Sequence, residues 1–171
     1  MPTFTQIGTA QVVGSGGATD ITFSSIPSTY TDLVLKISVR SNTARASNGF
    51  LFDIRPNGSS ANMTRRSVYG EGTGTPQSSS GSDGYNMALN PSDYTSSVFS
   101  STDIYIPNYA GATNKAISTD TVSENNATAV LTLLGSLLWS NTSAITSITL
   151  TPLAGSFVQY STAYLYGVSN A

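Results

Sequence analysis

The balance between β-branched and helix-favouring side chains is the feature that most limits what this sequence can fold into. Val, Ile and Thr together number 43 of 171 residues, whereas Glu, Lys and Gln together number 8. β-Branched side chains lose rotamer freedom in a helical turn but pack well on a pleated sheet. Gly, Pro, Asn and Ser interrupt the chain about every ten residues, the spacing of strands joined by turns. We therefore expect an all-β fold with almost no helix.

Two early segments alternate as strands with one buried face. In residues 31–40, the side chains on one face are Leu33, Leu35, Ile37 and Val39. In residues 49–56, one face carries Phe50, Phe52 and Ile54, and the other carries Leu51, Asp53 and Arg55. Both segments predict half-buried strands.

The second half of the chain continues in strands of different character. Residues 98–109 predict a strand with Ile104 and Ile106 inward, and residues 114–124 predict a polar strand at a sheet edge. Residues 127–139 are apolar on both faces, which indicates a central strand covered on each side or a strand that bends at Gly135. Periodicity alone also leaves a helix open here. Two further strands, within residues 143–152 and 156–168, are expected to close the chain.

Nine or ten short strands in one domain predict an antiparallel β-sandwich, jelly-roll-like, with an extended N-terminal arm. Residues 1–19, ending in a glycine-rich stretch, are expected to be that arm or an edge strand, and residues 20–171 the sandwich domain. Residues 70–84 are too rich in Gly and Ser to bury side chains, so we expect a flexible exposed loop there.

The composition excludes several kinds of chemistry. The sequence has no His and no Cys, which excludes zinc sites of the usual kind, thiolate nucleophiles, histidine bases and disulfides. We therefore expect no metal and no cofactor. The first 13 residues lack a basic start and a continuous apolar run, and no window approaches ~18 apolar residues. We expect a soluble protein with no membrane partner and, at a formal net charge of −2, no nucleic-acid partner.

The charge is unevenly distributed along the chain. Residues 40–66 carry a net charge of +4, contributed by five arginines and one aspartate, whereas residues 67–171 carry −5. A basic patch of one copy could meet an acidic patch of another, although a solvated face without a partner is the more common outcome.

Paired carboxylates are the one acid/base arrangement left open, as in glycosidases. Asp53 is the best candidate, because Arg40 and Arg55 are expected nearby, but a surface ion pair between strands explains it more simply. No S-x-x-K pattern, calcium loop or nucleotide-binding glycine loop is present.

The nine tyrosines offer a second binding chemistry. A tyrosine ring is apolar on its face and polar at its tip, so it can stack on a sugar. Tyr69, Tyr85 and Tyr94 are the candidate glycan contacts. Tyrosine is also common in strands and at subunit interfaces, which leaves a purely structural role open.

Three segments resemble virion proteins of tailed bacteriophages. They are ITFSSIPSTYTDLVLKISVRS at 21–41, DIYIPNYAGATNKAI at 103–117 and LLWSNTSAITSITLTPLAGSFVQYSTAYLYGV at 137–168. Proteins of this kind, especially in cyanophages, are similar to jelly-roll capsid decoration (cement) proteins and to β-sandwich tail or neck appendages.

The resemblance implies a non-enzymatic structural role on the capsid surface, with the protein made in the host cytoplasm. It further implies the major capsid protein as partner and a homotrimer. The expected contacts with the shell or with neighbouring copies are Phe4, Ile7, Arg45, Arg65 and Arg66. The alternative is a tail, neck or fibre module that binds host-surface glycan through Tyr69, Tyr85 and Tyr94.

Overall fold

Residues 31–40 and 98–109 form strands with the buried faces that the sequence predicts. In β5 (Leu51–Pro56), Phe52 and Ile54 are buried as predicted, but Asp53 on the other face is buried as well, so the strand is not half-buried. The computed structural model describes residues 1–72, 74–128 and 130–169. Leu33 and Leu35 on β4 (Asp32–Ser38) and Ile106 on β9 (Ser101–Pro107) are fully buried. The described residues contain thirteen strands, more than the nine or ten expected, and one turn of 3-10 helix, η1 (Arg45–Ser47). The all-β prediction is confirmed.

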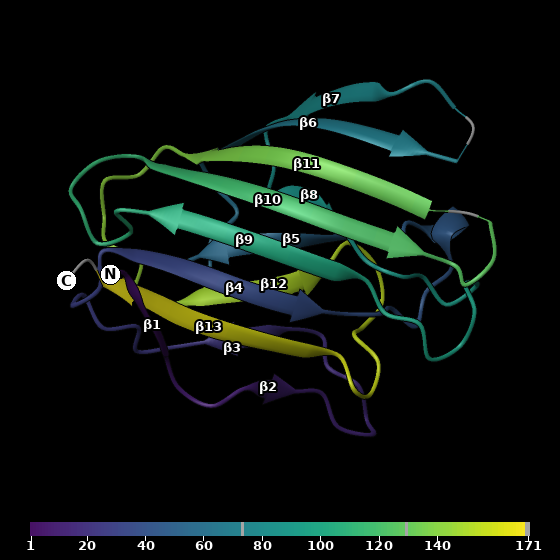
Figure 1. Ribbon diagram of the computed structural model, residues 1–171, viewed down its shortest axis with the longest axis horizontal. Helices are drawn as coiled ribbons and strands as arrows, with labels where there is room; N and C mark the ends of the chain where they lie inside the picture. Colours follow the sequence, from purple (N-terminus) through teal and green to yellow (C-terminus); the bar gives the residue numbers. More distant parts are fainter. Residues whose placement is uncertain (73, 129, 170–171) are drawn as a thin grey trace.

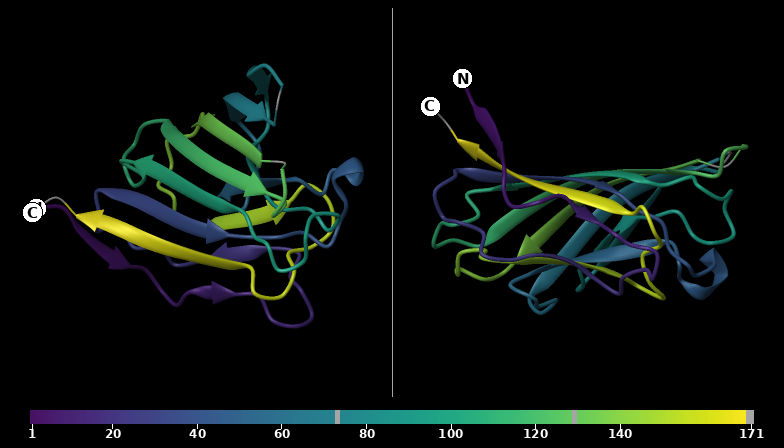
Figure 2. Two further views of the ribbon diagram at one scale, coloured as in Figure 1. Left: turned by 45° about the vertical axis from the view of Figure 1, so that its right-hand side comes forward. Right: turned by 90° about the horizontal axis from the view of Figure 1, so that it is seen from below.

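The strands form two antiparallel sheets that pack face to face (Figures 1 and 2). The large sheet runs in the order β1 (Thr3–Gln6), β13 (Thr162–Ser169), β4, β9, β10 (Lys115–Glu124), β11 (Val130–Trp139), β6 (Met63–Glu71) and β7 (Gln77–Gly81), and β2 (Gln11–Val12) also pairs with β13. The small sheet runs in the order β3 (Ile21–Phe23), β12 (Ile148–Pro152), β5 (Leu51–Pro56) and β8 (Tyr85–Ala88). The antiparallel β-sandwich is confirmed, and the jelly-roll connectivity stays a prediction.

The apolar core lies between the sheets and includes the inward side chains of β4, β9 and β13. Phe52, Ile54 and Leu150 of the small sheet are fully buried. The rings of Phe52 and Phe157 meet edge to face, with centroids 6.2 Å apart. Because both inner faces carry large aliphatic and aromatic side chains here, this part of the sandwich is filled.

Residues 1–19 run along an edge of the large sheet. β1 pairs with β13, with Thr3 opposite Ser169, so the two ends of the described chain lie side by side (Figure 1). β2 pairs with the same strand, and Ile7 and Val13 are buried in the core. Of the two predictions for this segment, the edge strand matches its position in the sheet.

β10 lies inside the large sheet, between β9 and β11, so the prediction of an edge strand is wrong. Its inward Thr119, Thr121 and Ser123 are at most 4% exposed. Their hydroxyls find partners inside the protein: the Thr102 and Thr121 hydroxyls are 3.1 Å apart, and Ser123 Oγ donates to Asn90 Oδ1 at 2.6 Å. A polar pattern therefore does not indicate an edge when hydroxyl groups satisfy one another in the interior.

β11 is a strand, which excludes the helix that periodicity left open, but only one of its faces is covered. Its register with β10 and β6 continues through Gly135 without a shift. Leu133 is 6% exposed on the inner face, whereas Leu134 and Leu138 are 52% and 41% exposed on the outer face. The prediction of cover on both faces is wrong. Residue 129, in the same predicted segment, lies outside the described residues.

The predicted loop at 70–84 contains strand structure. β6 continues to Glu71, and Gln77–Gly81 form β7, which pairs with β6 at the outer edge of the sheet. The loop prediction is wrong for these residues, because an edge strand can form by backbone pairing without burying its side chains. Residue 73 of this segment and residues 170–171 of the predicted domain lie outside the described residues.

Candidate ligand pocket

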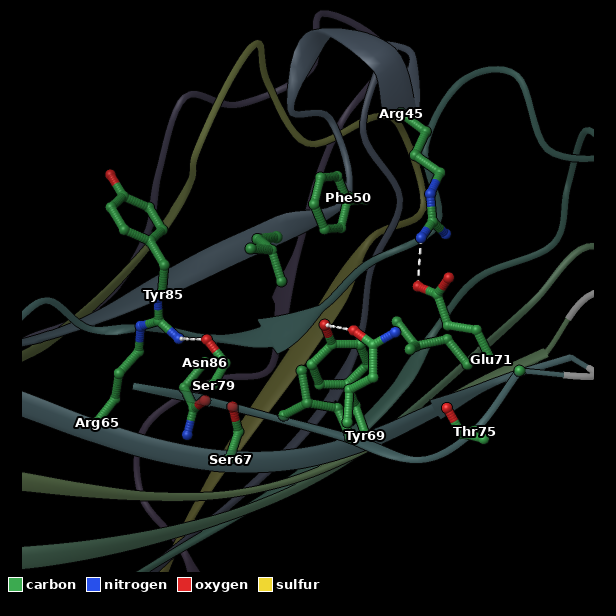
Figure 3. A pocket seen from close by; sticks show the side chains of 15 residues that line it. Arg45, Phe50, Arg65, Ser67, Tyr69, Glu71, Thr75, Ser79, Tyr85 and Asn86 are labelled. Carbon is green, nitrogen blue, oxygen red and sulfur yellow. Dashed lines mark hydrogen bonds and ion pairs between the residues drawn. The ribbon is translucent and has the colours of Figure 1, made fainter. Parts of the chain in front are cut away.

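The small sheet ends at β8, so β7 and part of β6 extend past it (Figures 1 and 2). A pocket of about 440 Å³ lies under this extension, a size typical of small-molecule sites. β6, β7 and β11 form one wall, and the segment from η1 into β5 and the start of β8 form the other. Figure 3 shows the pocket from close by.

Aromatic side chains face the pocket from both walls. Phe50, which precedes β5, and Tyr69 on β6 lie on opposite sides of it (Figure 3). The Tyr69 hydroxyl donates to Gln77 Oε1 at 2.6 Å, and this bond keeps the ring in position along the wall. Tyr85 on β8 also lines the pocket. Two of the three candidate glycan contacts therefore line one cavity.

The third candidate, Tyr94, connects to the same pocket through Arg45. Arg45 forms an ion pair with Glu71 and donates from Nη1 to the Tyr94 hydroxyl at 2.9 Å. The Arg45 guanidinium also lies over the Phe50 ring, 5.1 Å from its centroid. These contacts hold the charged end of the pocket in one arrangement (Figure 3).

Arg65 occupies the other end of the pocket, next to Tyr85 (Figure 3). Its Nε donates to Asp83 Oδ1 at 2.7 Å, and its Nη1 donates to Ser79 Oγ at 2.9 Å. Both arginines of the pocket thus have a carboxylate partner from the chain itself.

Small and polar side chains line the deepest part of the pocket. Ser67 and Asn86 are 7% and 1% exposed, and Leu131 and Leu133 complete this floor. A Cβ on Gly135 would lie 1.9 Å from Asn86 Nδ2, so the glycine lets β8 approach β11 closely. Asn86 Oδ1 has no hydrogen-bond partner among the described residues. The floor therefore holds a buried acceptor that the protein leaves unsatisfied.

Asp53 is not the surface residue that the sequence predicts. Its side chain is fully buried, and Arg55 Nε on the same strand donates to its Oδ2 at 3.0 Å. Burial raises the pKa of Asp53, while the hydrogen bond and charge of Arg55 oppose this rise and the charge of Asp83 adds to it. Arg40, expected nearby, forms its hydrogen bonds elsewhere. A carboxylate this enclosed has no surface to offer a glycosidic bond, so the geometry gives the glycosidase hypothesis no support.

Most arginines of residues 40–66, which could have formed a basic patch, are bonded within the chain. Arg40 is 7% exposed and donates to the backbone carbonyls of Ser92, Tyr94, Thr95 and Val98. Burial lowers the pKa of Arg40, and the charge of Asp93 opposes this. Three others form ion pairs, namely Arg45, Arg55 and Arg65.

The predicted capsid contacts are dispersed. Phe4 is 60% exposed on β1, whereas Ile7 is buried in the core and is not available to a partner. Arg45 and Arg65 belong to the pocket, and Arg66 is exposed on the outer face of β6. Of the five residues, Phe4 and Arg66 remain open to contact.

The outer face of the large sheet is a second candidate surface, which the sequence did not single out. We call it the outer apolar face; its members are Val68 on β6, Tyr105 on β9, Val122 on β10, and Val130, Leu134 and Leu138 on β11, all 41–54% exposed. Leu134 is paired with Val68 on one neighbouring strand and with Asp120 on the other, so these side chains lie in register across the sheet. The second apolar face of residues 127–139, which the sequence alone predicts to be covered, forms part of this exposed surface.

Two kinds of site are missing from the described part of the chain. No three Asp or Glu side chains come together in an arrangement that could hold a metal ion. No helix there has the length and apolar character needed to cross a membrane.

Comparisons with known proteins identify no relative: no protein family, curated protein or solved structure matches the chain. The resemblance of residues 21–41, 103–117 and 137–168 to phage virion proteins therefore stays a hypothesis.

Proposed function

We propose that this chain is a structural protein of a tailed-phage particle, of the capsid decoration type, which binds the shell and catalyses no reaction. The observation that carries the proposal is the outer apolar face, an aliphatic surface that no other part of the described chain covers. Exposed apolar side chains gathered on one face are typical of a surface that meets a partner. The resemblance of the three segments to decoration proteins supplies the kind of partner.

Polar and charged side chains lie among the aliphatic members of the outer apolar face. Ser118 and Thr132 are between them, and the exposed Asp120 is paired with Leu134. Arg66 is exposed on the same face, and Lys36 forms an ion pair with Asp103 there. The aliphatic side chains supply the apolar burial that drives binding, and the partner has to complement the exposed charges.

The chain path gives this proposal further support. Successive strands from β3 to β6 alternate between the two sheets, as do β8 to β9 and β11 to β13. Crossings between sheets are a feature of jelly rolls, which occur in viral capsids and also in lectins. We propose the major capsid protein as the partner and a cyclic homotrimer on the capsid surface as the assembly. Binding to the expanded shell, and not to its precursor, would stabilise the shell by mass action.

Co-sedimentation of the full chain with expanded shells of the matching major capsid protein tests the proposal. We expect Leu134→Ser together with Val68→Ser to lower the affinity for the shell about tenfold or more, equivalent to roughly 1.4 kcal/mol. Leu153→Ser, at an exposed leucine after β12, is the matched control and should bind like the unchanged chain.

The particle itself offers a second test. Virions that lack the protein should disrupt at a lower temperature than complete virions. An unchanged disruption temperature, or equal binding by the double variant and its control, would contradict the proposal.

A further inference from the structure

The pocket beneath the β6–β7 extension is not explained by attachment to a shell. Tyr69 and Val68 are neighbours on β6, but their side chains point to opposite faces of the sheet, one into the pocket and one into the outer apolar face. A protein that only docked through its outer face would not need a cavity on the inner one. We therefore consider the pocket as a separate binding site for a ligand.

The aromatic residues limit the shape of that occupant. Phe50 and Tyr69 present rings from opposite walls (Figure 3), and each ring is apolar on its face. A ligand between them is favoured if it has a compact ring with C–H groups on its faces. Long apolar chains fit poorly, because Gln77, Ser79 and Asn86 add polar groups to the same cavity.

The charged residues limit the charge of the occupant. Arg45 is paired with Glu71, and Arg65 with Asp83, so the pocket holds no arginine without a carboxylate partner from the described chain. The carboxylate on each arginine would repel a ligand carboxylate or phosphate, and the arginines would repel a ligand cation. Hydroxyl groups can instead share the remaining donor and acceptor positions of both pairs.

The floor adds a preference for polar groups. Ser67 and Asn86 line this part of the pocket, so a ligand with hydroxyl groups is better suited to it than a wholly apolar one. Asn86 Oδ1 itself is buried beneath the floor and is not counted as a ligand contact.

From the rings, the paired charges and the floor together, we propose that the pocket binds an uncharged carbohydrate, with the sugar ring between Phe50 and Tyr69. Its hydroxyls bond the Arg45–Glu71 pair at one end and Arg65 at the other, and Gln77 fixes the Tyr69 ring against the sugar. The inference goes beyond decoration of a capsid and is independent of it. The same site would serve a tail, neck or fibre module that attaches to a host-surface glycan.

Saturation-transfer NMR on the full chain tests the ligand class. The probes are methyl glycosides of neutral hexoses and N-acetylhexosamines, together with their acidic counterparts, glucuronic and sialic acid, followed by an array of neutral and acidic oligosaccharides. We expect signals from neutral glycosides and none, or weaker ones, from the acidic set. Absence of any neutral binder in both assays, or a preference for acidic glycans, would overturn the inference.

Three substitutions test the site with the neutral glycan that binds best. Tyr69→Ala removes the ring and should lower affinity about tenfold or more, a loss of roughly 1.4 kcal/mol. Tyr69→Phe keeps the ring but loses its bond to Gln77, so its loss of affinity should be clearly smaller than that of Tyr69→Ala. Tyr160→Ala removes a ring that is 67% exposed and outside the pocket, and should change nothing. Equal affinities of the Tyr69→Ala and Tyr160→Ala proteins, or equal losses in the two Tyr69 variants, would overturn the stacking arrangement.

Substitutions at Val68 and Tyr69, which are adjacent on β6, test this inference and the proposed function separately. Val68→Ser should weaken shell binding and leave glycan binding unchanged, whereas Tyr69→Ala should do the reverse. Thermal melting of each variant establishes that the fold is retained. Failure of one proposal in this pair leaves the other intact.

Discussion

The inner face of the large sheet has two regions built from the same kind of strand. In one region, side chains of the small sheet fill the space against it, and in the other a pocket is left. Over β4, β9 and β13, aliphatic residues such as Leu35 and Ile104 meet Phe52 and Leu150 of the small sheet, and the space between the sheets is closed. Over β7 and the parts of β6 and β11 away from the buried Met63 and Trp139, the inward residues include Ser67, and the small sheet ends at β8, so a pocket remains. We call these the filled half and the open half.

The difference indicates that one half of the sandwich mainly stabilises the fold and that the other half provides an accessible binding site. The filled half removes large apolar side chains from water, which provides most of the free energy of folding. The open half leaves aromatic and charged side chains partly accessible, and a binding site requires this accessibility. Substitutions in the two halves should therefore have very different effects on the free energy of unfolding.

The largest effect is expected from Phe52→Ala in the filled half. Phe52 is fully buried and meets the ring of Phe157, so the substitution leaves a cavity as well as removing apolar burial. We expect a loss of about 3–5 kcal/mol in the free energy of unfolding, measured by chemical denaturation. A loss below about 1 kcal/mol would mean that this half is not closely packed.

Gly135→Ala tests the boundary between the two halves. The added Cβ would lie 1.9 Å from Asn86 Nδ2 and 2.5 Å from Thr119 Oγ1, so the buried side chains of Asn86 on β8 and Thr119 on β10 have to move. We expect a loss of about 1–3 kcal/mol in denaturation experiments, as for overpacking in a core. Gly70→Ala on β6 is the control, because a Cβ there meets nothing within 4 Å. Equal stabilities of the two variants would show that close approach of β8 is not required.

The contribution of Asp53 to the free energy of unfolding should depend on pH with a sign opposite to that of most carboxylates in folded proteins. Burial raises the pKa of Asp53 above its ordinary value of 3.8, so the folded protein binds this proton more readily than the unfolded chain. Between 3.8 and the raised pKa, the contribution of Asp53 to stability therefore falls as pH rises.

Asp53→Asn removes this titration. The stability of the unchanged protein relative to the variant should increase as the pH is lowered from 7 towards 3.8, measured by denaturation at several pH values. The opposite slope would mean that the ion pair with Arg55 outweighs burial.

The smallest effect on stability is expected from Tyr69→Ala in the open half. The ring lines the pocket and is only half-buried, so its loss creates no enclosed cavity. We expect a change below about 1 kcal/mol in the same denaturation assay. A loss comparable to that of Phe52→Ala would show that Tyr69 belongs to the core and not to a site.

Much of the filled half could be predicted from the sequence. The alternation of Leu33, Leu35 and Ile37, and that of Ile104 and Ile106, correctly identified the buried faces of β4 and β9. Such residues can be recognised locally, because an aliphatic side chain at every second position has one favourable environment, the interior.

The open half and the outer apolar face could not be predicted in the same way. Thr119 and Thr121 are buried although a polar strand indicated an edge, and Leu134 is exposed although an apolar strand indicated cover on both sides. The chemistry of Tyr69, Tyr85 and Tyr94 makes them candidates for binding, but nothing in the local sequence shows that they lie around one pocket.

The sequence by itself determined that this chain forms strands, which faces of the most regular strands are buried, and that histidine and cysteine chemistry is absent. These properties depend on side-chain type and on a period of two residues. Only the tertiary structure decided which strands lie next to one another, where the small sheet stops, and which arginines pair with carboxylates. The reason is that these contacts join residues far apart in the chain, and their partners are set by the packing of two sheets of unequal width.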